Sequence, residues 1–244
     1  LLCLLSAAVK ERLVSDVPVG AFLSGGVDSS AVVALARREL PYELHTFTIG
    51  FQQRSYDEAD DARRVADYLR TVHHERRLDL GAAQAGAQTL RRAILAYDEP
   101  FSDTSLIPTF EVARSAARHV KVVLSGDGAD ELLGGYPTYQ ADQLMTRAAR
   151  LPAPLLGLAA ALLRRSPQDT RRRTGLGFKL RRLGRGLDRD PRYAHYCWRE
   201  LHDEEERIAL IGQEHAEEVR AHHPFHVFAR YYEEAAGLDW LAQH

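Results

Sequence analysis

The first half of the chain alternates between two patterns of hydrophobic and polar residues. Short runs that are continuously apolar, or that alternate apolar with polar residues, predict strands at residues 19–23, 44–49, 72–78 and 120–124. Apolar residues spaced three and four apart predict helices from Ser29 onward and at residues 57–69, 82–97 and 108–118. Because strands alternate with helices, we expect an α/β fold with a doubly wound, mainly parallel sheet. The charged 72–78 strand should lie at an edge.

The segments before and after this region show a helical pattern. A first amphipathic helix has its apolar residues on one face, at Leu2, Leu5, Val9 and Leu13, without the basic region that would precede the core of a signal peptide. Later helices are predicted at residues 144–150 and 155–163, and within 202–220 and 227–241. We therefore expect an α/β core at residues 1–148 and a helical extension at residues 149–244. We expect the extension to be incomplete, because the chain stops inside a helical pattern.

The segment Val19–Ala36, VGAFLSGGVDSSAVVALA, has the pattern of a strand, a glycine-containing loop and a helix. Free N–H groups at the start of such a helix favour an anion. Gly25 and Gly26 would let the backbone approach a phosphate closely, and Ser24 and Ser29 offer hydroxyl groups. These residues predict a phosphate-binding loop. The alternative is a glycine-rich turn that only connects the strand to the helix.

The charges in this segment narrow the prediction. It contains no lysine, so the Walker pattern that grips a transferring γ-phosphate is absent and a kinase or GTPase is disfavoured. It does contain Asp28, and a carboxylate beside polyphosphate is repulsive unless a divalent cation bridges the two. Asp28 is therefore predicted to bind Mg²⁺.

A second glycine-containing loop follows the 120–124 strand, in the segment SGDGADELLGGY. Asp127, Asp130 and Glu131 gather there at the predicted start of a helix, where a single carboxylate would be read as a helix cap. Three carboxylates between glycines fit a cation site better. If the strands that precede the two loops are neighbours at the switch point of the sheet, the loops meet, and Asp28 and Asp130 would hold Mg²⁺ together.

Four segments together resemble the synthetase domain of the glutamine-hydrolysing asparagine synthetases, which are N-type ATP pyrophosphatases with an adenine nucleotide α-hydrolase-like fold. The segments are residues 13–36, 47–51 (FTIGF), 73–75 (HHE) and 124–136, with a looser match at 178–185. The resemblance implies that Asp127 supports formation of an aspartyl adenylate and that Asp28 and Asp130 bind Mg²⁺. It also implies ATP contacts at Leu23, Ile49, Ser125 and Gly126. Together with the predicted phosphate loop, the residues expected to bind ATP are Leu23, Ser24, Gly25, Gly26, Asp28, Ser29, Ile49, Ser125 and Gly126.

The resemblance further implies a ligase that cleaves ATP to AMP and pyrophosphate, activating the side-chain carboxylate of aspartate for attack by ammonia from a glutaminase domain. Two alternatives remain open: the same chemistry on another acid, as in a β-lactam synthetase or a biosynthetic amidotransferase, and a non-catalytic nucleotide-binding domain. The glutaminase domain with its N-terminal cysteine nucleophile and a later L-x-K-x-D-R segment of the family are absent from these 244 residues. We therefore expect this stretch alone to bind ATP weakly and turn over poorly.

Composition adds limits on partners and location. The chain is 45% hydrophobic and 27% charged with a net charge of −2, so no global attraction to nucleic acid or membrane is expected. No run approaches the roughly 18 to 20 apolar residues of a membrane span. Cys3 and Cys197 form no metal or disulfide pattern, which favours a reducing cytoplasm. A homodimer is possible.

Two polar clusters in the second half have competing readings. The basic run from Arg164 to Gly186 could be a solvated face, a nucleic-acid contact or a cationic wall near the pyrophosphate, and its few aromatic residues disfavour nucleic acid. His222, His223 and His226 suggest a metal site, but no cysteine accompanies them and a proline interrupts them, so metal binding is the less favoured reading. His73 and His74 are predicted to pack and hydrogen-bond.

Overall fold

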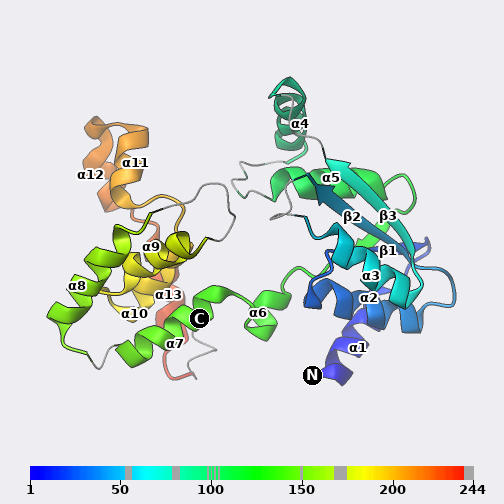
Figure 1. Cartoon of the computed structure of the whole chain (residues 1–244), viewed down its shortest axis with the longest axis horizontal. Helices are drawn as coiled ribbons and strands as arrows, with labels where there is room; N and C mark the ends of the chain where they lie inside the picture. The colour runs from blue at the N-terminus through cyan, green and yellow to red at the C-terminus, as the bar shows by residue number, and fades with distance from the viewer. Residues whose placement is uncertain are drawn as a thin grey trace. The chain divides into compact units, whose positions relative to one another are not determined.

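The computed structural model describes residues 1–52, 57–78, 83–97, 99, 101, 103, 105–148, 151–167 and 175–238. The chain divides into two compact units, Leu1–Ala129 and Asp130–His244, which are described separately (Figure 1). This division falls earlier in the chain than the expected end of the α/β core at residue 148. Of the basic run, residues 168–174 lie outside the described residues.

The first unit alternates strands and helices as the hydrophobic pattern predicts. Its elements are α1 (Leu2–Arg12), β1 (Val19–Phe22), α2 (Val27–Glu39), β2 (His45–Phe51), α3 (Ala59–Leu69), β3 (Val72–Leu78), α4 (Ala83–Leu95), α5 (Leu106–Ala116) and β4 (Val122–Leu124). One boundary differs in a way that concerns the site. The helix after β1 begins at Val27 instead of Ser29, so Asp28 lies in its first turn and not in the loop.

The four strands form one parallel sheet in the order β3-β2-β1-β4 (Figure 1). β3 lies at an edge, as its charge predicts. The chain moves outward from β1 through β2 to β3 and then returns to the other side of β1 for β4. The switch point of the sheet is therefore between β1 and β4, where a parallel α/β sheet places its ligand crevice.

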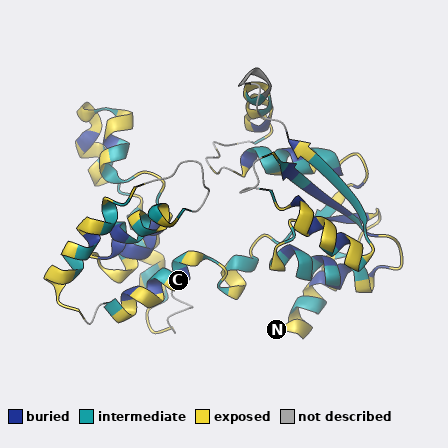
Figure 2. Ribbon diagram, viewed as in Figure 1, coloured by how far each residue is buried: buried dark blue, intermediate teal, exposed yellow. Residues whose placement is uncertain are grey.

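Helices cover both faces of this sheet, which makes it doubly wound. On one face, Ala21 and Leu23 of the β1 segment pack with residues of α1, α2 and α3. On the other face, Phe22 and the fully buried Phe47 pack with α5. Figure 2 shows the resulting pattern, with the central strands buried and the outer sides of the helices exposed. The alternation of neighbouring β1 residues between the two cores follows from the period of two in a strand.

Ion pairs join the charged residues of β3 to helices on both faces of the sheet. Glu75 is held by Arg63 of α3 and by Arg77, whose Nε lies 3.0 Å from the carboxylate. Glu111 of α5 is buried and pairs with Arg76 at 3.0 Å and Arg114 at 2.9 Å. The charged residues that mark β3 as an edge strand are thus compensated by neighbouring helices.

The second unit is helical, as predicted. Its elements are α6 (Ala129–Leu133, which begins at the division), α7 (Pro137–Ala148), α8 (Ala153–Arg164), α9 (Leu176–Gly186), α10 (Pro191–Arg199), α11 (Glu204–Ile211), η1 (Gln213–His215), α12 (Ala216–Ala221) and α13 (Phe225–Glu234). The sequence pattern predicted neither α9 nor α10 as a helix, although Asp190 caps α10 through the N–H of Arg192 and Pro191 occupies its first turn. The residues predicted as helical beyond 238 lie outside the described range.

A compact core holds the second unit together. The side chains buried there are Met145 of α7, Ala160 of α8, Leu187 at the end of α9 and Trp198 of α10. Beside this core, His195 of α10 contacts Asp142 of α7 through a 2.7 Å hydrogen bond, with both side chains buried. In neither unit does a described helix have the length and apolar character needed to cross a bilayer.

Candidate nucleotide-binding site

The loop after β1 is ordered by its own serines. Ser29 Oγ accepts a hydrogen bond from the N–H of Ser24 at 3.2 Å and lies 2.9 Å from Ser24 Oγ. Ser24 Oγ in turn accepts from the N–H of Gly26 at 3.2 Å. These bonds fold the loop back onto the start of α2, with the buried Ser29 as the anchor and Ser24 exposed.

The start of α2 offers backbone donors to a ligand. Gly26 is the N-cap residue, and no side chain caps the helix. The first helical bond comes from the N–H of Ser30, which donates to the carbonyl of Gly26 at 3.1 Å. The N–H groups before Ser30 in the helix have no earlier helical carbonyl to reach, and the helix dipole adds positive potential there. This is an anion-binding arrangement in a helix of 13 residues.

Asp28 lies in this first turn and is half-buried. No described residue pairs with its carboxylate. The helix dipole is sufficient to stabilise an aspartate at this position, so the presence of Asp28 does not by itself indicate a bound cation. When phosphate oxygens occupy the same turn, however, the carboxylate needs a counter-ion, and carboxylate plus phosphate oxygens is a donor set that suits Mg²⁺.

Gly25 fixes the path of the loop. Its φ is +81°, a conformation that favours glycine. A Cβ at this position would also lie 2.6 Å from the backbone nitrogen of Ala62 in α3 and 2.8 Å from the carbonyl carbon of Asp61. The glycine is therefore required both by the turn and by the close approach of α3, a constraint that the sequence motif alone does not reveal.

β2 supports the loop from its other side. The N–H of Leu23 donates to the carbonyl of Phe47 at 2.9 Å, and Thr48 Oγ1 donates to the carbonyl of Leu23. Leu23 is thereby held at both backbone groups. Ile49, one of the expected ATP contacts, is half-buried near the carboxyl end of β2. The sequence did not indicate Thr48 as a supporting residue, since a threonine in a strand carries no separate signal.

The second loop reaches the first through Gly126. β1 and β4 are paired, with Ala21 opposite Leu124, so the loops after them leave the sheet side by side. A Cβ on Gly126 would lie 3.0 Å from the backbone nitrogen of Ser29 and 3.3 Å from the carbonyl carbon of Asp28. The expected meeting of the two loops is thus present within the first unit, with Gly126 against the first turn of α2.

Ser125 orders the remainder of this loop. Its Oγ donates to Asp127 Oδ2 at 2.9 Å and accepts from the N–H of Asp127 at 3.2 Å. The Asp127 side chain is exposed. Gly128 follows with a φ of +87°, and a Cβ added to it would have no atom within 4 Å, so its role is conformational only. The loop therefore presents the carboxylate of Asp127 to solvent in an orientation set by Ser125.

The other acidic residues of this segment belong to the second unit. Asp130 and Glu131 lie in α6, beyond the division after Ala129. Glu131 accepts a 2.7 Å hydrogen bond from Tyr136 Oη, and this bond lowers the pKa of the Glu131 carboxyl. The pairing of Asp28 with Asp130 at one cation stays a prediction.

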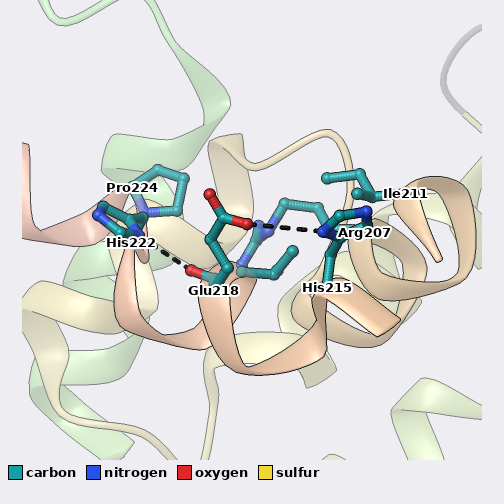
Figure 3. A pocket seen from close by; sticks show the side chains of 7 residues that line it. Arg207, Ile211, His215, Glu218, His222 and Pro224 are labelled. Carbon is teal, nitrogen blue, oxygen red and sulfur yellow. Dashed lines mark hydrogen bonds and ion pairs between the residues drawn. The ribbon is translucent and has the colours of Figure 1, made fainter. Parts of the chain in front are cut away.

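The histidines of the second unit are involved in separate contacts. Figure 3 shows a cavity of about 480 Å³ where the carboxylate of Glu218 points toward His215, 3.6 Å away, and the carbonyl of Glu218 accepts from His222 Nδ1 at 3.1 Å. His223 instead lies 3.2 Å from the hydroxyl of Tyr193. Within the described ranges, the metal-type grouping of side chains involves other histidines, in the first unit.

The chain is similar in sequence to known proteins. The family model for asparagine synthase matches residues 1–238. The chain is 45% identical over 155 residues to "Putative asparagine synthetase [glutamine-hydrolyzing] 2" of Methanocaldococcus jannaschii, a match covering 61% of this chain and 28% of that protein. It is 38% identical over 148 residues to asparagine synthetase [glutamine-hydrolyzing] 1 of Bacillus subtilis, covering 61% and 23%.

Among solved structures, the NH3-dependent NAD synthetase from Campylobacter jejuni aligns with a TM-score of 0.38 and 22% identity, covering 55% of this chain and 58% of that one. The matched stretch spans about a quarter of the length of the two curated relatives. Since the family match extends over nearly the whole chain, this chain belongs to the asparagine synthase family.

Proposed function

We propose that this chain is the ATP-binding part of an ATP-dependent amide-forming ligase that makes asparagine from aspartate and ammonia. The observation that carries the proposal is the contact between the two loops at the β1/β4 switch point, where Gly126 packs against the uncapped first turn of α2. Together with membership of the family, this contact supports an anion-binding corner to which the backbone of both loops would contribute. ATP enters this corner with its phosphates toward α2.

The reaction proceeds in two displacements. A carboxylate oxygen of aspartate attacks the α-phosphorus of ATP, the bond to the β-phosphate breaks, and pyrophosphate leaves. Ammonia then attacks the acyl carbon of the adenylate, loses a proton and displaces AMP. Neither step needs a protein nucleophile, so the work of the protein is positioning and stabilisation of charge.

The residues of the first loop would act on the departing pyrophosphate. The backbone N–H groups at the start of α2 are donors fixed in place by Ser24, Ser29 and Gly25 before the substrate arrives. Such preorganised donors stabilise charge that develops during the reaction. Leu23 and Ile49, at the ends of β1 and β2, would contact the nucleoside. In the second loop, Ser125 and Gly126 would approach ATP by their backbone.

Asp28 would hold Mg²⁺ at the start of α2. A bound Mg²⁺ supplies charge neutralisation on the phosphate oxygens. The protein side of this proposal is that Asp28 is a carboxylate in the same helical turn as the anion-binding N–H groups. Asp127 would orient the substrate acid or the adenylate, because Ser125 holds its carboxylate in a fixed direction at the solvent-exposed edge of the loop.

The activated acid is tested by isotope exchange. The natural full-length protein is incubated with ATP, Mg²⁺, labelled pyrophosphate and one acid at a time, and label appearing in ATP is measured. Exchange that depends on aspartate supports the proposal. Exchange only with another carboxylic acid would transfer the same chemistry to a different substrate, and no exchange with any acid would support a non-catalytic nucleotide-binding domain.

A pair of variants separates the role of Asp28 from its effect on the helix. Asp28→Asn removes the proposed ligand and also a favourable dipole interaction of about 0.3–1 kcal/mol. Asp60→Asn makes the same change in the first turn of α3, at an exposed carboxylate that pairs with Arg63. We expect Asp28→Asn to abolish exchange and Asp60→Asn to preserve it, with similar small losses of stability in both. Unchanged exchange in Asp28→Asn would show that the magnesium assignment is wrong.

A further inference from the structure

Three histidines from separate segments gather in the first unit, away from the loops described above. They are His45 at the first position of β2, His74 in β3 and His119 in the connection between α5 and β4. One nitrogen from each lies within 4.8 Å of the others. His45 is the residue at which β2 begins, whereas the nucleotide loops follow the carboxyl ends of β1 and β4. The cluster therefore lies toward the amino ends of the parallel strands, opposite to the nucleotide loops.

The sheet register brings the rings together. His45 and Phe47 point to the same face of β2, and Phe47 is opposite His74 in β3. His45 Nδ1 lies 2.9 Å from His74 Nε2, and the ring centroids of His74 and His119 are 4.0 Å apart. The His74 ring also stacks on Phe47 at 5.0 Å. The neighbouring His73 contacts Thr46 instead, on the other face.

We propose that His45, His74 and His119 form a binding site for a borderline divalent transition-metal ion, with Zn²⁺ the best-fitting ion. Imidazole nitrogens suit Zn²⁺, Cu²⁺ and Ni²⁺, whereas Mg²⁺ prefers oxygen ligands. Since the cluster contains histidines and no carboxylate, the magnesium used with ATP would not compete for it. Three histidine ligands with one open position form a recurrent Zn²⁺ arrangement.

The distances require only a small adjustment. Zn–N bonds of about 2.0–2.1 Å in a tetrahedral site separate the ligand nitrogens by about 3.3 Å. The His45–His74 pair at 2.9 Å must open slightly, and the wider separations, up to 4.8 Å, must close. His119 is the exposed member, so its ring can move without disturbing the core. Its exposure also gives an ion access and leaves room for a water ligand.

Imidazole binds a metal ion through a ring nitrogen that carries no proton, so the three nitrogens can act as ligands together only in the neutral rings. A cation that binds all three nitrogens would replace the hydrogen bond between His45 and His74 with bonds to the metal.

The competing explanation is that the three histidine rings only pack against Phe47 and the hydrophobic core that contains it. Two substitutions of the exposed histidine distinguish packing from binding. His119→Phe keeps a planar ring that can stack on His74 and removes the nitrogen, whereas His119→Ala removes both. His202→Ala is the matched control, because His202 is an exposed histidine of the second unit whose side chain is 57% exposed.

The experiment measures Zn²⁺ binding to the full-length protein, purified without a polyhistidine tag and treated with chelator. Titration calorimetry gives affinity and stoichiometry, and Co²⁺ in place of Zn²⁺ gives the visible absorption of a tetrahedral site. We expect one saturable site that both His119 variants weaken by about 100-fold or more, because groups that merely hydrogen-bond a metal ligand are already worth about 10- to 100-fold. His202→Ala should bind as the unaltered protein does.

Each remaining result would overturn the proposal. If Zn²⁺ does not bind saturably, or if His119→Phe retains full affinity, the cluster is a packing feature. If His202→Ala loses as much affinity as the His119 variants, binding belongs to surface histidines in general. Thermal unfolding without metal confirms that His119→Phe is folded, so a loss of binding in that variant cannot be attributed to unfolding.

Discussion

Gly126→Ala tests whether the contact between the two loops matters for nucleotide binding. The added Cβ would lie 3.0 Å from the backbone nitrogen of Ser29, about 0.4 Å closer than the start of ordinary contact at 3.4 Å. Because the three nearest atoms all belong to the backbone of α2, no side chain can rotate to make room. The second loop must therefore retreat from α2 by a few tenths of an ångström.

The magnitude follows from this displacement. A misplacement of about 1 Å in a positioned site costs about 100-fold, so a shift of a few tenths should cost on the order of tenfold in ATP affinity. The stability cost of the extra methyl group is about 1–3 kcal/mol. ATP binding is measured by calorimetry and stability by urea unfolding of the same samples.

Gly128→Ala provides the matched control. It lies two residues further along the same loop, with a φ of +87° and no atom within 4 Å of its would-be Cβ. The substitution strains the backbone by roughly 1–2 kcal/mol without touching α2. It should therefore lower stability about as much as Gly126→Ala while leaving ATP affinity nearly unchanged. The reasoning from the loop contact would be refuted if Gly126→Ala bound ATP as tightly as the unaltered protein. It would also be refuted if Gly128→Ala lost as much ATP affinity as Gly126→Ala.

Three further predictions concern buried and paired groups. His195→Ala removes the histidine that lies 2.7 Å from the buried Asp142 carboxylate, and should lower the free energy of unfolding by about 3–5 kcal/mol. A loss under about 1 kcal/mol, measured by urea unfolding, would contradict this prediction. Cys197 is buried and its pKa is raised to about 11 by burial, whereas Cys3 is exposed, so a thiol reagent should modify one cysteine per native chain and two after denaturation. Two arginines lower the pKa of Glu75 from its ordinary 4.5, so its stabilisation is present above that pH and is lost as the pH falls through the lowered value. Glu75→Gln should then cost about 0.5–1 kcal/mol at neutral pH and nothing in strong acid, and a loss that is the same at both pH values would contradict the assignment.

Local patterns in the sequence were sufficient for most elements of the first unit. The strand at 72–78 was predicted with its observed bounds, and its charged residues indicated its edge position, because the period of a strand and the cost of burying charge act on neighbouring residues. α10 was missed because its buried residues are five in a row, from Ala194 to Trp198, and so do not show the spacing of three and four that marks a single helix face. They are buried because α7 and α9 pack against the helix.

The sequence by itself also determined the chemical character of the SGGVDSS loop, since its glycines, serines and aspartate limit what can bind there. Only the tertiary structure decided that Gly25 must accommodate α3 and that Gly126 packs against Ser29, because both contacts join segments far apart in the chain. The same holds for His45, His74 and His119. No local pattern connects these histidines, and it is the β2–β3 register together with the turn before β4 that brings their nitrogens together.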